Sequence, residues 1–208
     1  MNQPEASFRT LSRDERRRKI LFAAKVVFVE RGFDETSMDD IAAAAGTTKP
    51  TVYAHFKSKE ELFSAVLEFL RELFHERMGS PEQLSNDPLE AIAMYCGRII
   101  DLVSCKDVLA FHRVVISSAA RSPEMGAEVY NALLGSAVSA LSAYLQKNGF
   151  AKKPTDDAER MLAATVGAHL LRSLYGFRST VAPDDPQGDE SQVDIQKIRE
   201  TVAVFLAR

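Results

Sequence analysis

The feature that most constrains the fold of this chain is a series of helix-start signals, each followed by apolar residues at helical spacing. A hydroxyl or acidic cap residue with an acid three positions later, or a proline in the first turn, marks a helix N-terminus. These signals are Ser12 with Glu15, Thr36 with Asp39 or Ser37 with Asp40, Ser58 with Glu61, Asp87 with Pro88, and Ser122 with Pro123. No stretch shows the convincing alternation of a half-buried strand, so the sequence predicts an all-α fold.

The predicted helices fall into two groups. They span residues 12–31, 37–45, 48–55, 58–78, 88–104, 106–120, 123–147, 155–176 and 192–207. Very short connections at 32–36, 46–47 and 56–57 join the first four into a compact unit. We therefore expect a disordered arm at 1–11, a first domain at 12–60 and a helical domain at 61–208, because a 208-residue chain accommodates one or two domains.

Composition excludes several classes of protein. Cys96 and Cys105 lack a CxxC spacing, and the histidines at 55, 75, 112 and 169 lack a metal-binding spacing, so we expect no metal and no cofactor. The absence of a P-loop or GxSxG motif argues against an enzyme. No apolar run approaches the length of a membrane span or forms a signal core, so we expect no membrane partner and a cytoplasmic location.

Charge alone gives an ambiguous signal. The net charge is −3, but residues 9–25 carry seven basic side chains against two acidic ones. Such a surplus fits either a nucleic-acid contact or a solvated helix face.

Residues 38–57 have the pattern of a helix-turn-helix motif. Ala42 is small where two helix axes would cross, and Gly46 can take the left-handed conformation that turns the chain after the first helix. Ile41 and Val52 are placed to hold the two helices together. In such motifs the second helix lies in the major groove of DNA.

The second helix of this motif is short, and its outward face is polar. With Val52 and Phe56 turned inward, that face carries Thr47, Thr48, Lys49, Thr51, Tyr53 and His55. We expect Thr48 to cap the helix, which leaves Pro50 in the first turn, where it is tolerated. A helix N-terminus of this kind suits phosphates and base edges.

The segment GFDETSMDDIAAAAGTTKPTVYAHFKSKEELFSAVLE resembles the DNA-binding segment of the TetR family of bacterial transcriptional regulators, over residues 16–68. The resemblance implies that Thr36 and Ser37 hold a phosphate and that Lys57 binds another. It also implies base contacts from Thr47, Thr48, Lys49 and Thr51, and backbone contacts from Tyr53 and His55. Pro50 departs from the family's usual glycine or alanine, so its contact would be apolar, for example with a thymine methyl group.

The later helices are expected to form an effector-binding and dimerisation bundle. The stretch from FHRVVISSAARSPEMG to LSAYL is similar to AefR-like C-terminal domains of the same family. The predicted effector pocket comprises Phe74, Met94, Tyr95, Arg98, Phe111, His112, Ile116 and Tyr130. Arg98 and His112 are the candidates to orient an effector, since they are polar members of apolar helices. Aromatic residues and methionines at helical spacing are more often core than pocket wall.

Two apolar edges suit helix–helix contacts. They are Leu162, Val166, Leu170 and Leu174 on one helix, and Ile195, Ile198, Val202 and Phe205 on the last. Both edges fit an intramolecular core, whereas the resemblance implies a four-helix interface between two copies. A homodimer also suits the chemistry, because one short helix reads too few base pairs.

The sequence therefore predicts a dimeric, sequence-specific regulator that binds double-stranded DNA. The mechanism that the resemblance implies is a repressor that an unknown small-molecule effector releases from its operator. An activator remains open, as do a helical protein-interaction adaptor and a small all-helical enzyme.

Overall fold

The computed structural model describes residues 8–119, 123–176 and 193–207. Every regular element in these ranges is helical, which confirms the predicted all-α class. None of the described helices is long and apolar enough to cross a membrane. Packing groups the chain into two compact units, Met1–Leu70 with Val114–Glu128 and Arg71–Arg113 with Val129–Arg208. This grouping differs from the predicted division at residue 60, because the first half of α4 (Lys59–Met78) packs with the N-terminal helices.

The first unit is built on α1 (Arg13–Glu35), which begins with the predicted capping box. The Glu15 amide donates to Ser12 Oγ at 3.2 Å, and the Ser12 amide donates to Glu15 Oε2 at 2.7 Å. Gly32 has a φ of +82°, so it ends the regular helix close to the predicted position before one last turn. The cap and the glycine therefore set both ends of α1.

A short 3-10 helix, η1 (Phe8–Thr10), precedes α1. The Lys19 ammonium lies 5.9 Å from the centre of the Phe8 ring. The prediction of disorder is therefore wrong for residues 8–10, while residues 1–7 lie outside the described ranges.

Three aromatic rings form the core of the first unit. Phe28 meets Phe63 edge-to-face with 5.1 Å between ring centres, and Phe33 lies 5.8 Å from Phe28 and 5.1 Å from Phe63. Offset and edge-to-face pairs of this kind add roughly 0.5–1.5 kcal/mol each beyond area burial. They connect α1 with the first half of α4.

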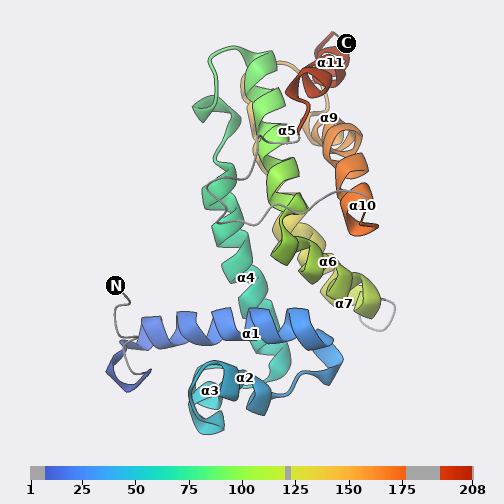
Figure 1. Ribbon diagram of the computed structural model, residues 1–208. Coiled ribbons are helices and arrows are strands. Elements are labelled where there is room, and N and C mark those ends of the chain that lie inside the picture. Colours follow the sequence, from blue (N-terminus) through green and yellow to red (C-terminus); the bar gives the residue numbers. More distant parts are fainter. Residues whose placement is uncertain (1–7, 120–122, 177–192, 208) are drawn as a thin grey trace, which may run out of the picture. The chain divides into compact units, whose positions relative to one another are not determined.

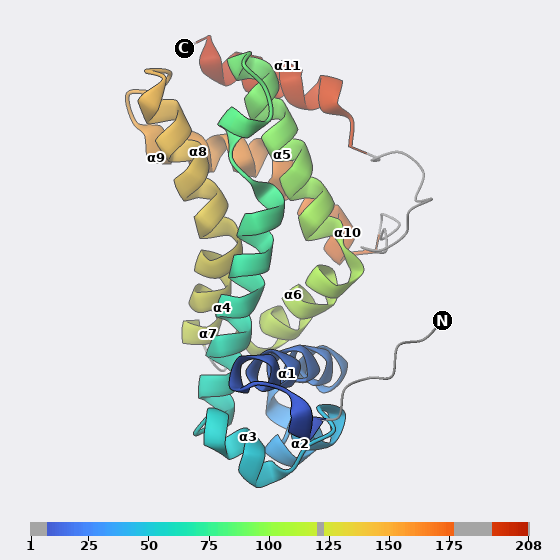
Figure 2. The same cartoon turned by 90° about the vertical axis from the view of Figure 1, so that its left-hand side faces the viewer.

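The helix-turn-helix is formed by α2 (Met38–Ala44) and α3 (Lys49–His55), which lie together beside α1 (Figures 1 and 2). Ile41 and Val52 are fully buried and Ala42 is 4% exposed, as the motif requires. Gly46 has the expected left-handed conformation, with a φ of +65°. A residue with a Cβ atom would be strained in this conformation.

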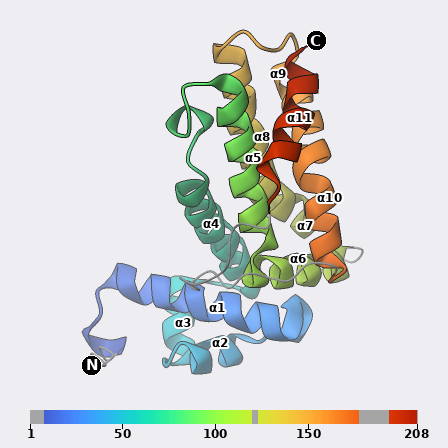
Figure 3. The ribbon, with the colours of Figure 1, turned by 45° about the horizontal axis from the view of Figure 1, so that its top comes forward.

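The second unit surrounds α5 (Pro88–Ser104), which begins at the predicted Asp87 cap. Buried residues cover most sides of this helix, and burial raises the pKa of the Cys96 thiol to about 11. The final helix, α11 (Ile195–Leu206), packs on α5, where a Cβ added at Gly97 would lie 2.6 Å from Ile195 Cδ1 (Figure 3). The missing side chain at Gly97 therefore leaves room for Ile195 against α5.

The remaining elements depart from the predicted helices at two π-helical turns. The predicted helix 123–147 divides into α7 (Pro123–Tyr130), η3 (Asn131–Gly135) and α8 (Ser136–Lys147). The predicted helix 155–176 divides into α9 (Pro154–Leu162), η4 (Ala163–Gly167) and α10 (Ala168–Leu174). Helices α8 and α9 pack together (Figure 2).

A 3-10 turn, η2 (Pro81–Gln83), was not predicted. Helix α6 (Lys106–Ala119) matches the prediction over the described residues, and residue 120 lies outside them. The Ser122 cap lies outside the described residues.

Candidate functional site

The exposed side of α3 carries the polar residues predicted for it. Tyr53 is 44% exposed, while Val52 and Phe56 on the inner side are 0% and 1% exposed. Thr48, Lys49 and Pro50 are exposed, and Thr47, Thr51 and His55 are half-buried. The helix is thus held by apolar residues on one side and presents hydroxyl, ammonium, phenol and imidazole groups on the other.

The N-terminus of α3 is arranged differently from the prediction. Thr48 is the N-cap residue, but its side chain makes no cap hydrogen bond. Its Oγ1 instead lies 2.9 Å from Oγ1 of Thr51, one turn along the same helix. Pro50 stands in the first turn as expected and has no N–H to satisfy.

At the start of α2, the structure selects Ser37 with Asp40 as the capping box. The Asp40 amide donates to Ser37 Oγ at 3.2 Å, and the Ser37 amide donates to Asp40 Oδ2 at 3.0 Å. The hydrogen bond from the Ser37 hydroxyl is the largest cause that lowers the pKa of the Asp40 carboxyl. Ser37 remains exposed, although its hydroxyl also serves the helix.

Thr36 is a correction to the predicted phosphate site. Its side chain is 2% exposed, and its hydroxyl donates to the carbonyl of Gly32 at 2.6 Å. Because this hydroxyl is buried and already hydrogen-bonded, the prediction that it holds a phosphate is wrong.

An ion pair joins the two helices of the motif. Lys49 Nζ lies 2.7 Å from Asp39 Oδ2, and this hydrogen bond is the main cause that raises the pKa of Lys49. Both side chains are at least half exposed, so water screens the pair and its contribution to stability is small. The Lys49 ammonium can therefore leave Asp39 for another anionic partner at little cost.

Lys57 lies between α3 and α4. Its amide donates to Glu61 Oε2 at 2.9 Å, and the Glu61 amide donates to Ser58 Oγ at 3.1 Å. The glutamate thus reaches one residue farther back than in the predicted capping box. This cap fixes the backbone of Lys57 and leaves its side chain exposed.

His55, at the end of α3, faces the basic start of α1. Burial is the largest cause that lowers the pKa of His55, and the charges of Arg13, Arg16 and Arg17 lower it further. The imidazole therefore takes up a proton less readily than a free histidine does.

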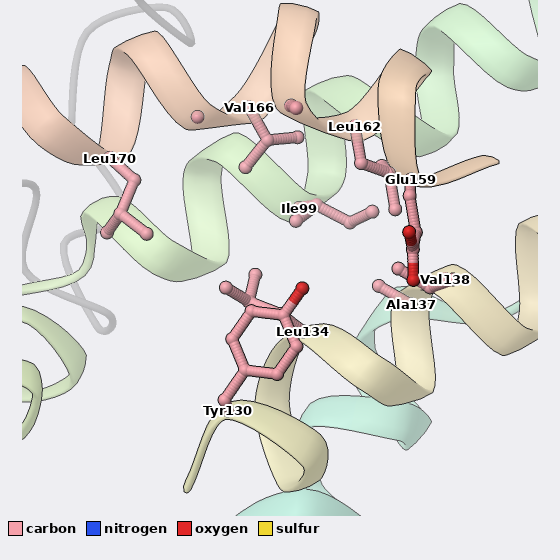
Figure 4. Close-up of a pocket in the computed structure, with 11 residues that line it drawn as sticks. Ile99, Tyr130, Leu134, Ala137, Val138, Glu159, Leu162, Val166 and Leu170 are labelled. Carbon is pink, nitrogen blue, oxygen red and sulfur yellow. The ribbon is translucent and has the colours of Figure 1, made fainter. Parts of the chain in front are cut away.

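The second unit contains a cavity of about 190 Å³. It is lined by Ile99, Tyr130, Leu134, Ala137, Val138, Glu159, Leu162, Ala163, Val166, Gly167 and Leu170. Figure 4 shows the Tyr130 hydroxyl and the Glu159 carboxylate among otherwise apolar walls. Both π-helical turns border this cavity, with Leu134 on η3 and Val166 on η4. In the described parts of the chain, no group of three or more His, Cys, Asp or Glu side chains could hold a metal ion.

Two family models match the chain. The model for bacterial regulatory proteins of the tetR family covers residues 20–66, and the model for the C-terminal domain of AefR-like transcriptional repressors covers residues 90–208. The second match alone covers more than half of the 208 residues. The chain belongs to the TetR family of bacterial regulatory proteins.

Matched TetR-family relatives are named as regulators of transcription. The activator FasR of Mycolicibacterium smegmatis is 55% identical over 58 residues, 28% of this chain and 26% of FasR. The repressor ComR of Escherichia coli is 33% identical over 106 residues, 50% of each chain. The matches thus span between about a quarter and a half of the length of these relatives. A putative TetR-family regulator from Mesorhizobium loti has the same fold, with a TM-score of 0.76, 23% identity and coverage of 95% of this chain and 98% of its own.

Of the eight residues predicted for the effector pocket of this TetR-family chain, Tyr130 alone lines this cavity. Arg98 is exposed and donates to the Met78 carbonyl at 3.4 Å, and His112 Nδ1 lies 2.9 Å from the Val108 carbonyl oxygen. One nitrogen of each side chain thus has a backbone partner within its own unit. Burial, opposed by the Val108 contact, lowers the pKa of His112.

The other predicted pocket residues are placed as follows. Phe74, Tyr95 and Phe111 are buried core residues, Met94 is half-buried, and Ile116 is 59% exposed and belongs to the first unit. The Tyr95 hydroxyl donates to the Ala137 carbonyl at 3.5 Å, and burial raises the pKa of this phenol.

The predicted dimer edges also need correction. Leu162 and Val166 are 7% and 2% exposed, and together with Leu170 they face the cavity. Ile198 and Val202 are 3% and 0% exposed within the same chain, and Ile195 packs at Gly97. Leu174 and Phe205 are half-buried. The four buried residues, Leu162, Val166, Ile198 and Val202, therefore belong to the interior of the second unit, which was the alternative that the sequence left open. For the half-buried residues, Leu170, Leu174, Ile195 and Phe205, the dimer contact stays a prediction.

Four small residues, Ala163, Ala164, Gly167 and Ala168, lie beside the edge that begins at Leu162, and their size permits close approach. Ala163 and Gly167 are small, and η4 places them at the cavity, but helical periodicity does not announce a π turn. On the outside of the same segment, Ala164, Ala168, Leu171 and Tyr175 are exposed, with Leu171 at 56% and Tyr175 at 74%. We call these four residues the outer stripe.

The capping difference between α2 and α3 can be tested by substitution. We expect Ser37→Ala to lower the free energy of unfolding by about 1 kcal/mol, because it removes an N-cap hydrogen bond. Thr48→Ala is the matched comparison and should cost less, since its hydroxyl makes no cap bond. Urea unfolding of both variants measures this difference. An equal decrease in the free energy of unfolding of the two variants would show that the Ser37 cap hydrogen bond adds no stability.

Proposed function

We propose that this protein is a dimeric, sequence-specific regulator of transcription that binds double-stranded DNA through α3. The observation that carries the proposal is the exposed polar face of a helix that is only seven residues long. A helix this short is marginal in water and persists because Val52 and Phe56 are buried. A protein-interaction adaptor or a small enzyme would leave this face without a role. Because bacterial DNA lies in the cytoplasm, the protein would act there.

The proposed contacts divide by chemistry. Lys49, Thr51 and their neighbours Thr47, Thr48 and Pro50 face base edges, with Pro50 limited to apolar contact. Lys57, Tyr53, His55 and Ser37 contact the backbone, where ammonium, phenol, imidazole and hydroxyl groups suit phosphate oxygens. Lys49 would release Asp39 on reaching DNA, at little cost because the ion pair is exposed.

The outer stripe supports a dimer. One seven-residue helix reads few base pairs, whereas a two-fold dimer presents two such helices about 34 Å apart on one face of DNA. Leu171 and Tyr175 are large apolar side chains with high exposure, and α11, which packs against η4 and α9, exposes Val204 at 58%. We place the dimer contact on these outward residues rather than on the buried edges.

The cavity is proposed as the effector site. Its volume of about 190 Å³ is close to that of engineered apolar cavities, roughly 150 Å³, that bind benzene. An effector would act by preferring one of two subunit arrangements, and the change in DNA affinity cannot exceed that preference. The AefR-like model is described as a repressor, which favours release from the operator. FasR is named an activator, which makes activation the second candidate.

DNA binding can be tested with duplexes selected from a random pool at two salt concentrations. We expect Lys57→Ala to weaken binding to all sequences and to lower the salt slope by about 1, because it removes a phosphate contact. Thr51→Ala should instead change the preferred sequence and keep the slope. Binding that does not weaken with salt would exclude the proposed mode of DNA recognition.

The dimer surface predicts a change in oligomeric state. Leu171→Asp places a charge on the proposed contact, so the dimer dissociation constant should rise more than tenfold. Sedimentation velocity measures it, and Gln146→Asp, on an exposed site of α8, is the matched control. A variant that stays as dimeric as the control would remove the outer stripe from the interface.

The cavity predicts binding of small apolar molecules. Toluene or indole should raise the melting temperature, since a molecule that binds only the folded state stabilises it. Ala163→Leu should abolish this shift by occupying the cavity, and Ala143→Leu, exposed on α8 away from the lining, should preserve it. If both variants kept the shift, the molecules would bind elsewhere.

A further inference from the structure

Basic side chains at the start of α1 gather beside the end of α3. Arg13, Arg16 and Arg17 lie close enough to His55 for their positive charges to lower its pKa further than burial alone does. His55 is half-buried but belongs to the outward side of α3. Residues about forty positions apart in sequence therefore bring cationic groups to the edge of the proposed reading surface.

Arg17 is positioned by an aromatic ring at the end of α3. The carbon at the centre of its guanidinium lies 5.3 Å from the centre of the Phe56 ring. Phe56 is 1% exposed and is the C-cap residue of α3, so this ring is fixed. A cation over an aromatic face is held while its N–H groups stay available for other partners. The contact thus ties Arg17 to the helix that reads DNA.

Arg13 and Arg17 have no carboxylate partner among the ion pairs of the described residues. Arg16 differs, since it is half-buried and its Nε donates to the Leu11 carbonyl at 2.9 Å. The Glu15 carboxylate accepts the Ser12 amide in the capping box. Basic residues in the first turns of a helix also oppose its dipole, so their presence does not help α1 fold. The cluster fits a polyanion better than it fits a solvated structural role.

We propose that Arg13 and Arg17, together with His55, bind backbone phosphates of the duplex beyond the base pairs that α3 reads. We call these three residues the phosphate flank. This inference rests on the proposed function, since it needs the duplex to lie on α3. It adds contacts on α1 that the resemblance over the helix-turn-helix does not assign. A phosphate at this site would also offset the arginine charges around His55, so binding would take up a proton.

The test compares charge-neutral variants of α1 in the full-length protein. Arg17→Gln, Arg13→Gln and the double variant are titrated onto a duplex selected by the wild type, over a range of salt concentrations. Removing one phosphate contact should lower the salt slope by about 0.9, while the preferred sequence stays the same. Arg18→Gln is the matched control, because Arg18 is exposed on the same turn but does not act on His55. Melting temperatures verify that all variants fold.

A second readout is the pH dependence of DNA affinity, which reports protonation of His55. His55 is the one histidine of the first unit, the others being at 75, 112 and 169. Because its pKa is lowered in the free protein and a phosphate would raise it, DNA affinity should increase as pH falls from 8 to 6. His55→Gln should remove this pH dependence.

The outcomes separate the two proposals. An unchanged salt slope in the double variant, with normal sequence selection, would overturn the phosphate flank and leave the proposed function standing. An equal decrease in Arg18→Gln would also overturn it, by showing a general effect of net charge. A pH dependence that survives in His55→Gln would remove His55 from the flank. If the wild type selects no duplex, the proposed function itself fails.

Discussion

Burial of two apolar side chains, Val52 on α3 and Phe56 at its C-cap, is the constraint on which the helix-turn-helix depends. A helix of seven residues cannot offset the entropy of its own nucleation in water, so its stability must come from its packed side. Fully burying a side chain such as Val or Phe contributes about 1.5–3 kcal/mol, and Val52 and Phe56 are both buried. Because these two residues form the packed side of the helix, the rest of its surface is free to be polar.

The polar groups around α3 divide into those that build the motif and those that remain exchangeable. The Thr36 hydroxyl is buried against the end of α1, and Ser37 completes a capping box, so both serve the fold. The Lys49–Asp39 pair and the contact between the hydroxyls of Thr48 and Thr51 are exposed. Exposed pairs contribute little to stability, so replacing them with contacts to a ligand costs little. The same surface can thus be ordered before binding and still be available for it.

Local signals predicted most of the first unit, because each acts within a few residues. The Ser12 and Ser37 caps, the turn at Gly46 and the inward Val52 all follow from short-range geometry. Thr36 and Ser37 both fitted the capping pattern of α2. The path of the chain after Gly32 buries Thr36 and leaves Ser37 exposed at the start of the helix. Sequence alone could not choose between them.

The second unit was predicted less well for a different physical reason. An apolar edge such as that of Leu162 and Val166 indicates that a helix surface is buried. It does not indicate whether the same chain or a second copy covers that surface. Arg98 and His112 are polar residues in apolar helices, which suggested ligand groups, yet one nitrogen of each contacts a backbone carbonyl, of Met78 and Val108 respectively. Which chain buries an apolar edge, and which partner a polar side chain has, both depend on long-range packing. The periodicity of a sequence carries no information about such packing.

The π turn η4 adds a constraint that joins the cavity to the outer surface of the second unit. Ala163, Val166 and Gly167 line the cavity, while Ala164, within the same five residues, belongs to the outer stripe. A π turn has a wider hydrogen-bonding loop than an α-helix and often marks a functional position. Because packed interiors respond to added volume by moving their walls, a molecule that shifts this turn from the cavity side must also shift Ala164. In the proposed function, the effector and the dimer contact therefore act on the same short segment, η4. Their coupling does not require a longer chain of contacts through the protein.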